Sequence, residues 1–272
     1  MRTSCVTTTE GPCSAPGERS GDPAEGFQLL ALPTGEAVAE QAARMLLEAC
    51  LERPRRPLGL ATGRTMAPVY SAFLTMVRDC SAEERDLLCQ DWCSFNLDEY
   101  VGLGPEDASS FAAEMAAGLG QPLGLAPTRL HLPDGRAADP DAEARRYETA
   151  WRQAGGVGLQ LLGLGLNGHV GFNEPPCGPE SRCRCVSLCA STRRANAAAF
   201  GGDPSRVPER AITLGLAEIL QADQILLVVT GAAKAPVLRR LLQSPPSAEL
   251  PASWLQHHRC VKVLADEAAL TP

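Results

Sequence analysis

Three short segments of the sequence carry residue types that could bind an anion or move protons. The anion candidate reads Thr62-Gly63-Arg64-Thr65 and lies between a short apolar run and a predicted helix. Free backbone N–H groups, hydroxyls and the positive end of a helix dipole suit a phosphate group. A plain turn in which Thr65 caps the helix explains the same residues equally well. The loop lacks the Gly-x4-Gly-Lys-Ser/Thr pattern, so a triphosphate with magnesium is not implied.

Two adjacent carboxylates, Asp98 and Glu99, end a second apolar run. Burying a charged group is costly, so such acids are either exposed or used. Taken alone, the segment favours a surface turn with hydrated acids. The alternative is a general base whose pKa is raised by burial.

The third segment surrounds His169 and follows another apolar run. Its glycines would let the backbone approach a ligand closely. A histidine titrates near neutral pH, and a carboxylate such as Glu174 would orient the ring and raise its basicity. Asn167 and Asn173 lie beside it in the sequence, which favours a functional histidine over a structural one.

Strands and helices alternate along the chain. Strands are predicted at 27–32, 58–61, 92–97, 157–164, 225–230 and 261–264. Helices are predicted at 34–50, 66–77, 109–117, 140–153, 211–220 and 232–242. This alternation predicts one α/β domain over residues 26–272, Rossmann-like, with three layers and a mostly parallel sheet. Residues 1–25 are rich in Ser, Thr, Gly and Pro, and we expect a disordered tail there. All three segments follow strands, at the sheet edge where α/β proteins bind ligands.

The composition is that of an ordinary globular protein, with 272 residues, 44% apolar and 21% charged. A net charge of −7 argues against nucleic-acid binding. The sequence predicts no membrane helix and no secretory signal, so we expect a cytoplasmic protein. The 11 cysteines lack paired Cys-x2-Cys spacing, even where four of them gather between residues 177 and 189, so no metal site is expected. Only two lysines occur, Lys234 and Lys262.

The segments F-N-L-D-E-Y-V-G-L, L-G-L-G-L-N-G-H-V-G-F-N-E-P and G-L-A-T-G-R-T resemble the glucosamine-6-phosphate deaminases. Those enzymes are grouped with the 6-phosphogluconolactonases, and the resemblance runs in order over residues 27–265. It implies a Rossmann-like fold, a small sugar phosphate as substrate and no metal or organic cofactor. The implied reaction converts glucosamine 6-phosphate and water to fructose 6-phosphate and ammonia. A homo-oligomer is compatible with the resemblance.

The resemblance also implies roles for individual residues. Asp98 would carry the proton between C2 and C1 of the open sugar, and Glu99 would have no catalytic role. His169 would relay the proton that opens the sugar ring, with Glu174 orienting it and the Asn167 side chain nearby.

For the phosphate group, the resemblance points to the loop of Thr62, Gly63, Arg64 and Thr65, joined by two cations. These cations are Arg193, in S-T-R-R-A-N, and Lys234, in T-G-A-A-K-A. The scarcity of lysine in this chain gives Lys234 some independent support.

Several positions depart from the family pattern. Asn167 stands where members carry Asp or Asn, and Asn cannot take a proton. The phosphate loop usually reads T-G-S-T-P, whereas this chain has Arg64 and Met66. Arg64 would either add a contact to phosphate or crowd the loop. Arg184 matches part of an allosteric site of some members, but its partner lysine is absent, so no such activation is expected.

Three other functions use the same scaffold. A 6-phosphogluconolactonase would carry Arg rather than Tyr100 and Ser-Leu-Phe-Pro rather than residues 172–175. A non-catalytic sensor would be expected to lack Asp98, His169 or Glu174. A galactosamine-6-phosphate deaminase acts on a sugar that differs from glucosamine 6-phosphate at one hydroxyl group. Selection between the two sugars depends on loop geometry.

Overall fold

The structure is a computed structural model that describes residues 26–271, so the tail predicted at 1–25 lies outside the described residues. Its centre is a seven-stranded sheet in the order β1-β10-β9-β6-β2-β3-β5, and every neighbouring pair is parallel. The strands are β1 (Phe27–Leu32), β2 (Leu58–Leu60), β3 (Ser94–Asn96), β5 (Leu130–His131), β6 (Leu159–Gly163), β9 (Gln224–Val229) and β10 (Val261–Asp266). The expected α/β class with a mostly parallel sheet is confirmed.

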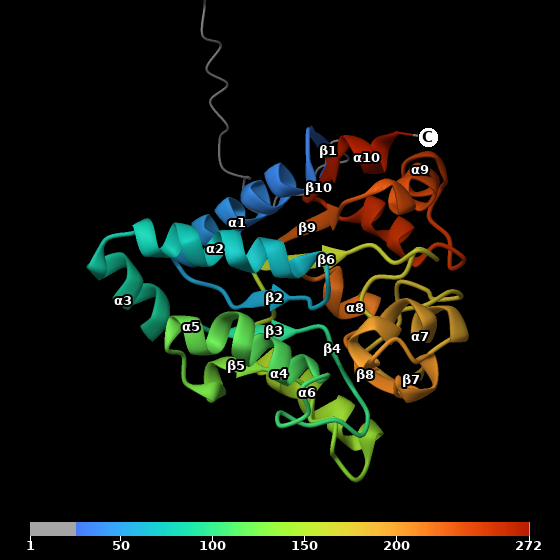
Figure 1. The fold of residues 1–272 in the computed structure, drawn as a ribbon, viewed down its shortest axis with the longest axis horizontal. Coiled ribbons are helices and arrows are strands. Elements are labelled where there is room, and N and C mark those ends of the chain that lie inside the picture. Colours follow the sequence, from blue (N-terminus) through green and yellow to red (C-terminus); the bar gives the residue numbers. More distant parts are fainter. Residues whose placement is uncertain (1–25, 272) are drawn as a thin grey trace, which may run out of the picture.

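Helices flank this sheet, and the long helices α1 and α2 pack side by side (Figure 1). They are α1 (Gly35–Leu51), α2 (Met66–Asp79), α3 (Ala82–Gln90), α4 (Phe111–Met115), α5 (Gln121–Leu123), α6 (Pro140–Gln153), α7 (Ala190–Asn196), α8 (Leu216–Ile219), α9 (Ala235–Gln243) and α10 (Glu267–Leu270). The Thr34 hydroxyl caps α1, and the Asp139 carboxylate caps α6 ahead of Pro140. Both predicted starts are therefore confirmed. A π-helical turn, Ala116–Gly120, continues α4.

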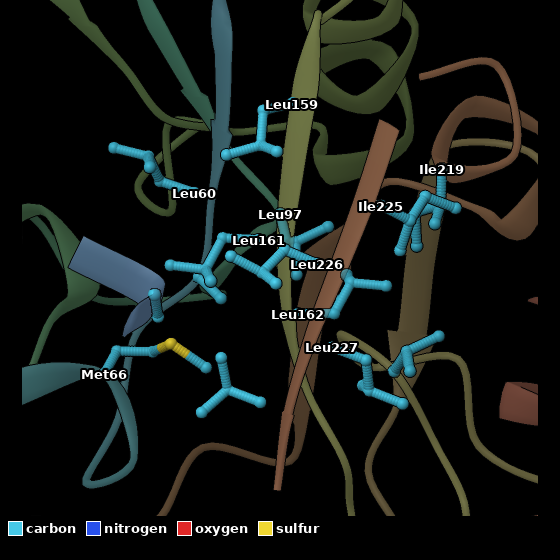
Figure 2. Close-up of a cluster of buried hydrophobic side chains, with 14 of the residues drawn as sticks. Leu60, Met66, Leu97, Leu159, Leu161, Leu162, Ile219, Ile225, Leu226 and Leu227 are labelled. Atoms are coloured by element: carbon cyan, nitrogen blue, oxygen red, sulfur yellow. The ribbon is translucent and has the colours of Figure 1, made fainter. Parts of the chain in front are cut away.

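The core lies on both faces of the central strands. Figure 2 shows Leu161, Leu162, Leu226 and Leu227 gathered around β6 and β9, and each of these side chains is buried completely. A parallel strand that is covered on both faces has no polar side, which explains the unbroken apolar runs in the sequence. The predicted strand at 225–230 is confirmed within one residue.

A second sheet was not predicted. It is antiparallel, in the order β4-β8-β7, and consists of β4 (Asp98–Tyr100), β8 (Arg210–Thr213) and β7 (Arg184–Ser187). The helix predicted at 211–220 is therefore wrong over its first part, and only α8 in its second part is helical. A short apolar run fits a buried strand or a buried helix equally well, and here pairing with β4 and β7 on both sides decides for the strand.

We predict that Leu161→Ala destabilises the protein by about 3 kcal/mol, because it removes a fully buried side chain and leaves a cavity in the core beside β6. Urea unfolding followed by circular dichroism measures this loss. The control Leu242→Ala, at a position that is 39% exposed, should cost less than about 1 kcal/mol. Equal losses for the two variants would contradict this picture of the core.

Candidate active site

Asp98 is a buried carboxylate at the point where the chain passes from the central sheet into the second one. Leu97 donates its N–H to Leu60 in β2, and Asp98 then pairs with Thr213 of β8. Its side chain is only 6% exposed, and no described residue donates a hydrogen bond to its carboxylate. Burial raises the pKa of Asp98 well above its usual range, and the charges of Glu99 and Glu114 raise it further. Such a group is suited to accept a proton.

Glu99 is also buried, but it has a structural use. Its carboxylate accepts hydrogen bonds from the N–H groups of Tyr100, Phe111 and Ala112, at 2.8 to 3.1 Å. Two of these are otherwise unpaired donors at the start of α4, so Glu99 caps this helix. The hydrated surface turn that the segment alone favoured is therefore wrong for both acids.

The loop after β6 brings His169 to the same region. Gly171 in this loop has a φ of +57°, and a Cβ built there would lie 3.5 Å from Oδ2 of Asp98 and 3.1 Å from Oγ1 of Thr213. The Thr213 hydroxyl also accepts the N–H of Phe172, at 3.2 Å. Two segments that are about 70 residues apart in the sequence thus meet at Asp98.

Asn167 determines which nitrogen of His169 carries the hydrogen. The Asn167 Oδ1 atom lies 2.6 Å from His169 Nδ1, while Asn167 Nδ2 donates to Glu174 Oε1 at 3.5 Å. Because the amide oxygen can only accept, Nδ1 donates, and Nε2 is left with its lone pair. Asn167 therefore lies between His169 and Glu174, whereas the resemblance implied that Glu174 orients the ring itself.

Burial lowers the pKa of His169 to about 4, although the charge of Glu174 opposes this and that of Lys234 adds to it. The ring is therefore neutral at pH 7, with Nε2 available to take a proton.

Glu174 is held by the start of α7. Cys189 donates to it twice, from its N–H to Oε2 at 2.8 Å and from its thiol to Oε1 at 2.7 Å, and the Thr192 hydroxyl donates to Oε1. Burial alone would raise the pKa of Glu174, but these hydrogen bonds and the neighbouring His169 outweigh it and keep the pKa below its usual value. Neither contact is evident from the sequence, because Cys189 and Thr192 lie 15 and 18 positions beyond Glu174.

The glycines of the third segment make room for the protein's own side chains. A Cβ on Gly165 would lie 2.3 to 2.4 Å from ring atoms of His169, and one on Gly168 would lie 2.3 Å from Leu250. Contact with the protein's own side chains therefore explains both glycines. The close approach of the backbone to a ligand, which the sequence led us to expect, is not required for either one.

The predicted phosphate loop connects β2 to α2. Gly63 has a φ of +100°, and its carbonyl accepts the N–H groups of Met66 and Ala67. Thr65 is the N-cap residue of α2 by position, but its side chain makes no capping hydrogen bond, which leaves its hydroxyl to other uses. The Gly63 N–H is already engaged, because it donates to Glu114 Oε1 at 2.8 Å.

A second cation, Lys234, accompanies Arg64 of this loop. Lys234 lies just before α9 and donates from Nζ to the Leu164 carbonyl at 2.6 Å. Burial lowers the pKa of Lys234, and the charge of Arg64 lowers it further. Two positive groups that repel each other in this way favour an anion between them.

Arg193 is placed elsewhere. Its hydrogen bonds within residues 26–271 go to the Pro204 and Ser205 carbonyls and to Glu209, so they bring it to the segment after α7 and not to the 62–65 loop. Arg184 is likewise engaged, with Asn173 and Cys177.

A cavity of about 560 Å³ opens between α1 and α2. Its lining includes Arg64 and Thr65 but neither Asp98 nor His169, so it borders the 62–65 loop and does not contain the two candidate proton-transfer groups. In the part of the chain that the structure describes, no three His, Cys, Asp or Glu side chains are grouped so as to hold a metal ion.

Comparison with known families identifies the scaffold. The model of the family described as glucosamine-6-phosphate isomerases/6-phosphogluconolactonase matches residues 33–264. The chain belongs to this family. Among curated family members, a glucosamine-6-phosphate deaminase of Rhodopirellula baltica is 40% identical over 238 residues, which cover 88% of this chain and 92% of that protein. One of Bacillus velezensis is 41% identical over 236 residues, 86% and 95% of the two chains.

Solved structures of the family agree. A monomeric glucosamine-6-phosphate deaminase, described as a missing link of the NagB superfamily, superposes with a TM-score of 0.85 at 37% identity over 90% of this chain and all of that one. A 6-phosphogluconolactonase from Leishmania guyanensis has a TM-score of 0.68 at 20% identity, over 90% and 97% of the two chains, and shares the fold. None of the helices within residues 26–271 has the length and apolar character needed to cross a bilayer.

We predict that Gly165→Ala raises the pKa of His169 from about 4 toward its usual value near 6.5. The added methyl group cannot fit against the imidazole, so the ring must move away from its buried position. NMR titration of the imidazole nitrogens measures the pKa, with His169→Gln assigning the signal among the four histidines.

The control for this prediction is Gly118→Ala, because a Cβ there would meet no atom within 4 Å. It should leave the His169 titration unchanged. An unchanged titration in Gly165→Ala as well would show that the ring does not depend on this close approach.

Proposed function

We propose that this protein is a glucosamine-6-phosphate deaminase, which converts glucosamine 6-phosphate and water to fructose 6-phosphate and ammonia. The observation that carries the proposal is the buried carboxylate of Asp98, without a donor among the described residues and close to the loop that carries neutral His169. The curated deaminases that are about 40% identical over most of the chain support it.

Ring opening is the step that we assign to His169. Its Nε2 atom accepts the proton of the C1 hydroxyl and returns it to the ring oxygen, which leaves an aldehyde at C1. The hydrogen bond from Nδ1 to Asn167 keeps Nε2 unprotonated before the step. The charge of Glu174, which lies behind Asn167, stabilises the imidazolium while it exists.

Isomerisation follows at Asp98. Its carboxylate takes the C2 proton while the aldehyde oxygen takes a proton from solvent, which gives an enolamine between C1 and C2. Asp98 then delivers the proton to C1, and the C2 amine releases one proton to solvent. The product is an imine at C2, to which water adds before ammonia leaves. Because burial raises the pKa of Asp98, its carboxylate is a stronger base toward the C2 proton than an exposed aspartate would be.

The phosphate group is assigned to the loop of Thr62, Gly63, Arg64 and Thr65 together with Lys234. The effect of the Arg64 charge on the pKa of Lys234 supports this, as does the Thr65 hydroxyl, which makes no capping hydrogen bond to α2. A role for Arg193 in phosphate binding rests on the resemblance alone, since its contacts in the described residues lead elsewhere.

A deaminase is favoured over a lactonase by Tyr100. This side chain is buried against Phe111, Phe172 and Phe200, and its hydroxyl accepts a hydrogen bond from Asn196 at 2.9 Å. The arginine expected there in a lactonase would be a charge buried among aromatic rings.

All the proposed site residues lie on one chain, and a similar deaminase is monomeric, so we propose that one chain forms a complete site. The single domain at 26–272, the homo-oligomer and the cytoplasmic location remain predictions from the sequence.

The reaction is tested by incubating the protein with glucosamine 6-phosphate in buffer that contains a chelator and measuring both products. We expect ammonia and fructose 6-phosphate to form in equal amounts. Galactosamine 6-phosphate and 6-phosphogluconolactone are the matched alternatives. Faster turnover of either would assign the protein to that activity instead.

We predict that Asp98→Asn lowers kcat by about 10²- to 10⁴-fold, because the general base is lost, while KM changes little. Steady-state kinetics measure both constants. Turnover close to that of the wild type would exclude Asp98 as the base.

The same variant should be more stable than the wild type at pH 8. The folded-state pKa of Asp98 is raised, so the wild type loses stability as pH rises from the unfolded-state pKa through the folded-state pKa, and the substitution removes this titration. The difference should shrink toward pH 4, where Asp98 is protonated in the folded protein. Thermal unfolding at several pH values measures it, and a gap that widens at low pH would contradict the raised pKa.

A further inference from the structure

Glu114 is an acid beside the phosphate loop that neither the motifs nor the proposed chemistry uses. It lies on α4, and its Oε1 atom accepts the N–H of Gly63 at 2.8 Å, across 51 positions of sequence. Gly63 is the turn residue of the loop, with a φ of +100° and open space where a Cβ would stand. The carboxylate is partly buried, so water competes weakly for this hydrogen bond.

The N-terminal end of helix α4 is held by β4, the strand that carries Asp98. Glu99 follows Asp98 directly in β4, and its carboxylate accepts the N–H groups of Phe111 and Ala112. One five-residue helix is therefore tied by Glu99 to the strand that carries Asp98, and by Glu114 to the loop that would hold phosphate. Glu114 and Glu99 together form a fixed connection between the two ends of the site.

We propose that Glu114 is a positioning residue, which holds the phosphate loop at a set distance from Asp98 by accepting the Gly63 N–H. This inference rests on the proposed function, since a sugar phosphate must have its phosphate bound while C2 lies at the base. The Gly63 N–H is then used by the protein, and phosphate is bound by the Arg64 and Thr65 portion of the loop with Lys234.

The charge of Glu114 has a separate effect. It acts on Asp98 and Glu99 in β4, on Tyr100 in the same strand and on Tyr70 in α2, and in each case it raises the pKa. A negative charge beside an anion site also weakens phosphate binding. The hydrogen bond and the charge therefore oppose each other in their effect on affinity, and they can be separated by substitution.

Three substitutions separate them. Glu114→Gln keeps an oxygen acceptor for Gly63 and removes the charge. Glu114→Asp keeps the charge but is one methylene too short to reach Gly63. Glu114→Ala removes both. Glu83→Gln, at an exposed position on α3, is the control for a change of net charge.

Binding of inorganic phosphate, measured by calorimetry, reports on the loop without the chemistry. We expect Glu114→Asp to weaken it about tenfold, since a hydrogen bond that orders the loop is lost while the charge stays. Glu114→Ala should weaken it less, because loss of the charge offsets part of the loss of the hydrogen bond. Glu114→Gln should bind phosphate at least as tightly as the wild type, and the control should match the wild type. Weakening in Glu114→Gln equal to that in Glu114→Ala, or no weakening in Glu114→Asp, would overturn the proposal.

The pH profile of kcat/KM for glucosamine 6-phosphate is the second readout, and a merely structural role would not move it. In Glu114→Gln the acidic limb of this profile should move to lower pH, because one of the charges that raise the pKa of Asp98 is gone. If the acidic limb of the pH profile does not move, the proposed effect of the Glu114 charge on Asp98 is wrong. If the wild type releases no ammonia while phosphate binding responds as expected, the proposed function fails and the role of Glu114 in the loop stands.

Discussion

The buried carboxylate of Asp98 is the constraint on which the rest of the site depends. A charged group away from water costs free energy unless donors compensate for it, and the described residues provide no donor for this one. The strand of Asp98 is fixed by its pairing with β8 at Thr213, and Gly171 lies beside the carboxylate, where a Cβ would be 3.5 Å from Oδ2. A group held in this way has a raised pKa, which is what a proton-transfer step requires.

The site assigns different protonation states to its groups through their environments. Burial raises the pKa of Asp98, whereas Glu174 stays ionised because Cys189 and Thr192 donate to it. His169 is kept neutral by burial, and Asn167 selects its tautomer. Since an amide does not titrate in this range, Asn167 performs this selection at every pH at which the His169 ring is neutral. Pairs of titratable groups whose pKa values are moved apart are typical of acid–base active sites.

Much of the site geometry comes from two short helices. Helix α7 carries the donors that hold Glu174, and α4 joins the strand of Asp98 to the phosphate loop through Glu99 and Glu114. Both helices are too short to be stable alone, so their positions come from these caps and contacts. The candidate catalytic groups and the proposed anion loop are therefore held in part by helices outside the three strand-end segments.

The sequence by itself determined the parallel sheet, the position of three candidate segments at strand ends, and His169 with Glu174 as candidates, since apolar runs and glycine punctuation act over a few residues. The role expected of Asp98 came from the resemblance to a known family, because its own segment favoured a hydrated surface turn. Only the tertiary structure decided that 210–213 is a strand, that Cys189 touches Glu174, and that Glu114 binds the Gly63 N–H. Each of these depends on a hydrogen bond to a residue far away in the sequence, and a short run of residues does not specify its distant partner.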